Sequence, residues 1–133
     1  MKPEIIEYIH EPYFSGNLIK KISFFNKTTY EAILYDCGLI LNEKGKIQRF
    51  KFGSYNSEYL KECTYELYVQ KRTENSFYFF ILPYTFEVFT TKNSKDTIEW
   101  LDYFKKIKGS IVNDIEIGIE INSIEEFKKK INI

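Results

Sequence analysis

Few residues in this sequence have a type and spacing that could support catalysis. His10 is the single histidine, so a metal site with two histidines is excluded, and a Ser–His or Cys–His pair would depend on this one residue. Cys37 follows Asp36, but a reactive thiolate needs a positive neighbour that lowers its pKa, and none is adjacent in the sequence. We therefore expect no catalytic residue and no metal site, and we predict that the chain is not an enzyme.

The remaining candidates for chemistry are acidic pairs and glycine-rich loops. Glu116 and Glu120 lie on one face of a predicted strand, roughly 13 Å apart, which is too far for joint action on one bond. The glycines are too isolated to form a phosphate-binding loop: Gly16, Gly38, Gly45 and Gly53. We expect no cofactor.

A basic run is the most concrete surface feature; it comprises Lys44, Lys46, Arg49 and Lys51, with no acidic residue between them. In a strand over residues 47–52, Arg49 and Lys51 share one face, and Phe50 and Phe52 point the other way into the core. The run is either an anion-binding stripe, helped by backbone donors of the Gly45 turn, or a solvated strand edge protected from aggregation by its charges. Both interpretations are open.

An acidic cluster surrounds the C-terminal elements, and it comprises Asp114, Glu116, Glu120, Glu125 and Glu126. It is either an ordinary solvated surface or a face that meets a basic partner. The formal net charge of the whole chain is zero, from 19 basic and 19 acidic residues. Because no global field then attracts the protein to nucleic acid, we do not expect nucleic acid as a partner.

The aromatic content of 18% is high, with 12 Phe and 11 Tyr. A tyrosine can bury its ring and keep its hydroxyl hydrated, which suits interfaces. Tyrosines left over from the core are expected to anchor a protein partner: Tyr13, Tyr55, Tyr59 and Tyr84. Cys37 and Cys63 are either two reduced thiols or one disulfide. The N-terminal residues are too polar for a signal peptide, and the apolar run 77–82 is too short for a membrane span, so we predict a cytoplasmic protein.

The hydrophobic patterns predict one α+β domain over residues 1–133, mostly antiparallel and with about seven to eight strands. Strands are expected at 17–25, 28–35, 39–41, 47–52, 64–72, 77–82 and 85–91, and the strand at 77–82 is apolar enough to be buried on both faces. A helix follows over residues 94–108, with Ser94 as N-cap and Gly109 as its stop. Its apolar flank comprises Ile98, Leu101, Phe104 and Ile107, joined by Trp100 and Tyr103.

A β-α extension is expected beyond this core, over residues 110–133. The isoleucines at alternate positions from Ile115 to Ile121 are the most regular strand signal in the chain. Ser123 and Glu126 have the spacing of a capping box, and an apolar stripe behind them predicts a short terminal helix.

The order of elements from Gly16 to Gly109 resembles that of the pleckstrin-homology (PH) domain family. The opening strand Gly16–Lys21 and the closing run from Thr85 to Ile107 carry the resemblance, with Trp100 in the place of the family's helix tryptophan. It implies a bent barrel plugged by the helix, with ligands bound at the loop after the first strand, where Lys20, Lys21 and Lys27 would supply the charge. The second strand lacks the basic residues of the family's phosphoinositide binders. An alternative is an α+β sheet that the 115–121 strand joins after the helix.

We accordingly expect a non-enzymatic binding module that recognises a protein partner or an anionic ligand, such as an anionic lipid, through charged edges and tyrosines. The candidate ligand residues are Lys20, Lys21, Lys27 and the basic run; the candidate partner residues are Tyr55, Tyr59, Glu116 and Glu120. The alternative is a small bacterial immunity protein that inhibits a toxin enzyme, with the acidic cluster facing a basic nuclease cleft.

Overall fold

The computed structural model describes residues 11–54 and 64–131. In these residues nine strands form one sheet, with two helices. The elements are β1 (Phe14–Lys21), β2 (Lys27–Tyr35), β3 (Gly38–Glu43), β4 (Lys46–Lys51), β5 (Gly53–Ser54), β6 (Thr64–Thr73), β7 (Ser76–Leu82), β8 (Thr85–Thr90), α2 (Ser94–Lys105), β9 (Ile111–Asn113) and α3 (Ile124–Ile131).

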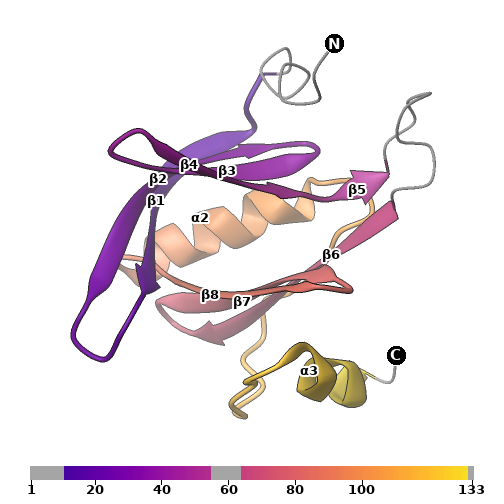
Figure 1. The fold of residues 1–133 in the computed structure, drawn as a ribbon. Coiled ribbons are helices and arrows are strands. Elements are labelled where there is room, and N and C mark those ends of the chain that lie inside the picture. Colours follow the sequence, from indigo (N-terminus) through magenta and orange to yellow (C-terminus); the bar gives the residue numbers. More distant parts are fainter. Residues whose placement is uncertain (1–10, 55–63, 132–133) are drawn as a thin grey trace.

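The strand order is β4-β3-β2-β1-β8-β7-β6-β5, and each neighbouring pair is antiparallel. β4 and β5 stand at opposite ends of this order, yet only Phe52 separates them in the chain. The sheet must therefore bend back on itself, and the β1–β4 half and the β6–β8 half face each other with α2 between them (Figure 1). The predicted α+β class with a mostly antiparallel sheet is confirmed.

Most predicted strands are present, but β1 differs. The expected strand 17–25 begins earlier, at Phe14, and ends at Lys21. Residues 22–26 instead form a turn, in which the Ile22 N–H donates to Asn26 O at 2.9 Å. The short polar residues Ser23 and Asn26 favour this turn over a continued strand.

β7 is buried along its whole length, as its apolar run predicts. Phe77, Phe79 and Ile81 face the main core, and Tyr78 and Phe80 face a second cluster on the outer side of the sheet. At the end of β7, Pro83 lies in a tight turn, in which the Tyr84 N–H donates to Ile81 O. The outer face of β7 therefore requires a cover.

The C-terminal segment covers this outer face. The prediction that residues Ile115 to Ile121 form a strand is wrong. The strand in this region is β9, which lies earlier and runs parallel to β6. The segment after it is irregular, with Gly118 at φ +66° and Ile115 and Ile119 mostly exposed. Two hydrogen bonds to the sheet help to hold it: the Gln70 Nε2–H donates to Ile115 O at 2.8 Å, and the Ile121 N–H donates to Tyr78 Oη at 3.0 Å.

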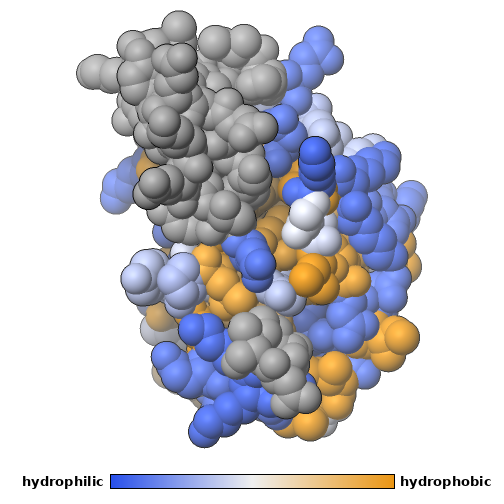
Figure 2. All heavy atoms as spheres, turned by 90° about the vertical axis from the view of Figure 1, so that its right-hand side faces the viewer, coloured by the Kyte–Doolittle hydropathy of each residue, from blue (hydrophilic) through white to orange (hydrophobic). Residues whose placement is uncertain are grey.

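α3 then packs on the outer face of the sheet through Phe127, which stacks on Phe80 with ring centroids 3.8 Å apart. The predicted cap is present in a shifted form, since Ser123 Oγ accepts the Glu126 N–H while Glu126 Oε2 accepts the N–H of Asn122. Figure 2 views the molecule from the right-hand side of Figure 1, where hydrophobic residues reach the surface in patches between hydrophilic ones. This mixture is typical of protein surfaces.

The N-cap of α2 lies one residue earlier than predicted: Asn93 is the cap, its Oδ1 accepts the Asp96 N–H at 2.9 Å, and Ser94 is the first helical residue. The buried face is Thr97, Trp100, Leu101 and Phe104, a spacing of three and four residues that the helix repeat places in one stripe. Ile98 lies just outside this stripe and is half exposed, contrary to the prediction.

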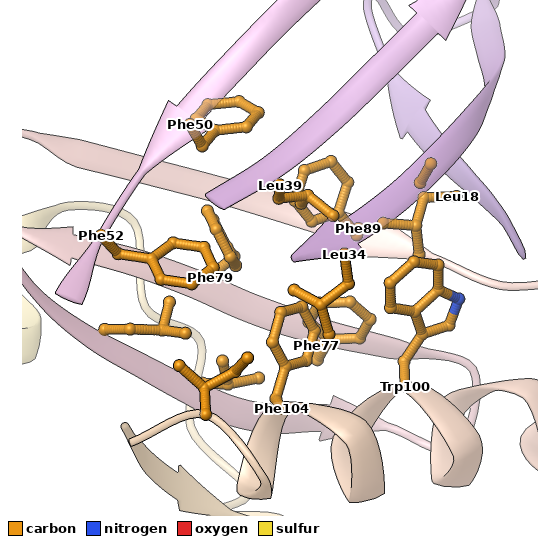
Figure 3. Packing of buried hydrophobic residues seen from close by; sticks show 14 of the residues in the cluster. Leu18, Leu34, Leu39, Phe50, Phe52, Phe77, Phe79, Phe89, Trp100 and Phe104 are labelled. Carbon is orange, nitrogen blue, oxygen red and sulfur yellow. The ribbon is translucent and has the colours of Figure 1, made fainter. Parts of the chain in front are cut away.

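α2 docks this stripe into an aromatic core between the two halves of the sheet (Figure 3). Trp100 is fully buried and meets Phe14 of β1 edge to face, with ring centroids 4.7 Å apart, while Phe104 packs against Phe77 and Phe79 of β7. The helix therefore joins both halves of the sheet.

Replacing Trp100 by Ala should lower the free energy of unfolding by about 3 to 5 kcal/mol, because a large side chain leaves a closely packed site. Ile98→Ala, on the exposed side of the same helix, should change it by less than about 0.5 kcal/mol. Urea denaturation of the two variants measures the difference. Equal stabilities would show that Trp100 does not support the core.

Candidate functional site

The turn between β1 and β2 presents three neighbouring exposed apolar side chains, among them Phe25, the most exposed large apolar side chain of the described residues. We define residues 22–26 as the hairpin tip. Within it Ile22 is 60% exposed, Phe24 79% and Phe25 89%. Phe24 and Phe25 pack edge to face with centroids 4.9 Å apart, so the two rings form one apolar knob. Burying each such side chain gives about 1.5 to 3 kcal/mol, so its exposure favours docking onto a second surface.

Lysines flank this knob on both strands. Lys21 and Lys27 are paired across β1 and β2, both are exposed, and Lys21 Nζ lies 5.1 Å from the centre of the Phe24 ring. Two like charges side by side repel each other, and an anion between them would relieve that repulsion. Lys20, by contrast, is held by Glu87 at 3.0 Å in a partly buried ion pair. Of the three lysines predicted here, Lys21 and Lys27 therefore present their charges outward.

The basic run lies at the same end of this half of the sheet. Asn42 pairs with Glu31, so the β3–β4 turn with Lys44 and Lys46 points in the direction of the hairpin tip, and residues 27–30 of β2 reach beyond it. The expected backbone donor of the turn is already used, because the Gly45 N–H donates to Asn42 Oδ1 at 3.1 Å. Glu43 also faces Lys46 across the turn.

Arg49 and Lys51 of the basic run project from one face of β4, as predicted, and both are half-buried. Phe50 and Phe52 lie in the main core instead. The structure therefore brings Lys21, Lys27, Lys44 and Lys46 to one end of the sheet, and places Arg49 and Lys51 further along β4.

The acidic cluster is largely engaged within the chain. Glu120 Oε1 accepts a hydrogen bond from Arg72 at 2.9 Å, which raises the pKa of the guanidinium, and Asp114 pairs with Lys105. Glu126 caps α3, as described above. Glu116 and Glu125 are exposed. Glu116 and Glu120 do not share a strand face, because no strand forms there.

Two of the four predicted tyrosine anchors can be placed: Tyr13 is 42% exposed and Tyr84 86% exposed. Tyr55 and Tyr59 lie outside the described residues, as do His10 and Cys63. The sequence prediction missed Phe24 and Phe25, which it placed inside a strand. The sequence does contain a sign that the strand ends earlier, because the alternation of apolar and polar residues fails at Ser23-Phe24-Phe25-Asn26. In the described parts of the chain, no helix has the length and apolar character that a membrane span requires.

Comparisons with known proteins bear on the fold alone. No family model matches the sequence, and no curated protein matches it. Among solved structures, the model is similar to a chain from the crystal structure of human RhoA in complex with the DH/PH fragment of PDZRhoGEF, with a TM-score of 0.56 and 12% sequence identity. The match covers 80% of this chain and a third (33%) of that chain. It supports a PH-like or related fold.

The Asp114–Lys105 pair predicts a dependence of stability on pH. The hydrogen bond from Lys105 holds the pKa of Asp114 below its ordinary value. The pair's stabilisation is therefore fully present above the unfolded-state pKa, about 3.9, and is lost as the pH falls through the lower folded-state pKa. Asp114→Asn should lower the melting temperature at pH 7, and this deficit should vanish in strong acid.

Glu116→Gln is the matched control, because Glu116 is an exposed acid of the same segment with no ion pair to a described residue. Thermal unfolding followed by circular dichroism at both pH values is the measurement. A deficit that stays constant with pH would contradict the role of the charge.

Proposed function

Taking the PH-like or related fold as the premise, we propose that this chain is a non-enzymatic binding module that docks onto an anionic membrane surface through the hairpin tip. The single observation that carries this proposal is the exposed knob of Phe24 and Phe25 between Lys21 and Lys27. Aromatic side chains favour the interfacial region of a bilayer, and lysines beside them are attracted to anionic headgroups.

Both the charges and the aromatic rings contribute to the binding free energy, and the aromatic rings contribute the larger part. Each lysine near an anionic surface contributes about 1 kcal/mol, and each inserted aromatic contributes up to about 1.5 to 3 kcal/mol. Two phenylalanines and two outward lysines then support reversible binding and not permanent anchoring. The zero net charge of the chain agrees with a local contact, because the attraction comes from the tip and not from the whole molecule.

A protein partner is the main competing target for the same tip. The DH/PH fragment is found in complex with RhoA, but the likeness to it extends to the fold and not to a surface. Inhibition of a toxin enzyme through the acidic cluster has less support, because Asp114, Glu120 and Glu126 already hold contacts within the chain.

Phe24→Ser with Phe25→Ser should weaken vesicle binding by about tenfold or more, since the variant loses the apolar part of the contact. Co-sedimentation with vesicles of phosphatidylcholine and phosphatidylserine measures it. Tyr84→Ser is the matched control, because Tyr84 is as exposed but lies on the β7–β8 turn. Unchanged binding of the double variant, or no binding by the unaltered chain, would refute the proposal.

Charge reversal tests the second contribution separately. Lys21→Glu with Lys27→Glu should abolish the preference for phosphatidylserine over pure phosphatidylcholine vesicles, and the binding of the unaltered chain should weaken as salt is raised. If the reversed variant keeps the preference, the lysines do not contact the lipid. If the tip variants lose a protein ligand while no form binds vesicles, the target is a protein.

A further inference from the structure

β1 has a second edge that the sheet hardly uses. One edge pairs with β2 over the whole strand, from Phe14 to Lys21. On the other edge the described residues provide one pair, Ile19 with Thr90 of β8. Between Phe14 and Leu18 the neighbour is α2 and not a strand, and a helix cannot complete a strand's hydrogen-bond ladder.

A groove lies between this edge of β1 and the N-terminal half of α2. Its volume is about 280 Å³, and its lining includes Gly16, Asn17, Asp96, Glu99 and Trp100. This volume is just below the range of about 300 to 1,000 Å³ that small-molecule sites have. The groove therefore suits a side chain beside an extended backbone better than a cofactor or a drug-sized ligand.

The groove carries negative charge. Asp96 and Glu99 are both half-buried, lie one helical turn apart, and form no ion pair with a described residue. Lys92 at the groove's edge is exposed and offsets part of this charge. Half-buried carboxylates without a cation favour a ligand that brings one, because desolvated charges gain most from a partner.

The indole of Trp100 adds a donor. The residue is 1% exposed, and its N–H donates to no acceptor among the described residues. Figure 3 shows the indole nitrogen on the side of the ring that faces away from Phe77 and Phe104. A Cβ placed on Gly16 would lie 3.5 Å from Trp100 Cζ2, so the ring reaches the backbone of β1. The nitrogen is not among the fully enclosed polar atoms without a partner, so it is open to the groove, where a ligand carbonyl would accept from it.

We propose that this groove binds an extended peptide of a second protein, which adds as a strand to the edge of β1. The peptide's backbone pairs with residues 14–18, a lysine or arginine side chain meets Asp96 and Glu99, and a peptide carbonyl accepts the Trp100 N–H. Strand addition of this kind derives its affinity from main-chain hydrogen bonds and its specificity from side-chain pockets. The surface is separate from the hairpin tip, so the inference goes beyond the proposed function.

A random octapeptide library displayed on phage, selected on the whole chain, tests this inference. Selection should enrich peptides with β-branched residues and at least one lysine or arginine. The selected peptides, once synthesised, should change the fluorescence of Trp100, the chain's one tryptophan, and should slow hydrogen exchange at the amides of residues 15–18. Failure to select a saturable binder, or protection of other amides in place of these, would overturn the inference.

Asp96→Asn with Glu99→Gln keeps the shape of the groove and removes its charge. This variant should bind the selected peptides about tenfold more weakly. Asp102→Asn is the matched control, because it removes a carboxylate from the same helix outside the groove. Equal affinity of the groove variant and the control would refute the basic-peptide assignment. Phe24→Ser with Phe25→Ser should leave peptide binding unchanged, which separates this test from that of the hairpin tip.

Discussion

The structure depends on one strand that is apolar on both faces. β7 carries large apolar side chains at almost every position, so both faces of the sheet must be covered where β7 lies. On the inner side its phenylalanines meet α2 and the β1–β4 half of the sheet; on the outer side Tyr78 and Phe80 meet the C-terminal segment and α3. The C-terminal residues are thus part of the packing around β7, and Tyr78 connects the two by accepting the Ile121 N–H.

Much of the fold could be predicted from local patterns. The double-sided burial of β7, the positions of β2 to β4 and of β6 to β8, and the tryptophan-bearing helix follow from hydrophobic period and turn residues. The conformation of residues 115–121 could not be predicted this way, because the alternation of isoleucines is satisfied equally by an irregular chain that is held at separate points. Ile117 and Ile121 pack in the second cluster, and no strand among the described residues pairs with Ile115 or Ile119. The buried Gln70 side chain of β6 holds the segment in place through hydrogen bonds with Asn113 and Ile115, and both partners are distant from it in sequence.

The candidate site was less predictable than the fold. Lys20 and Lys21 are neighbours in sequence, yet Glu87, from a strand far along the chain, neutralises one of them and not the other. The exposure of Phe24 and Phe25 reverses the usual expectation that aromatic residues are buried, and it depends on a strand that ends four residues before the expected point. The groove beside β1 exists because β8 pairs with β1 at a single position, and no local sequence pattern predicts how far two strands pair.

β1 is one continuous strand, and this gives the two proposed surfaces a fixed spacing. A strand advances about 3.3 Å per residue, so a peptide beside Gly16 would lie on the order of 20 Å from lipid in contact with the hairpin tip. Because β1 runs unbroken from the groove to the hairpin tip, it would fix the distance between a bound protein and the membrane surface. Inserting two residues into each strand of the β1–β2 hairpin would preserve the pairing register and increase that distance by about 7 Å.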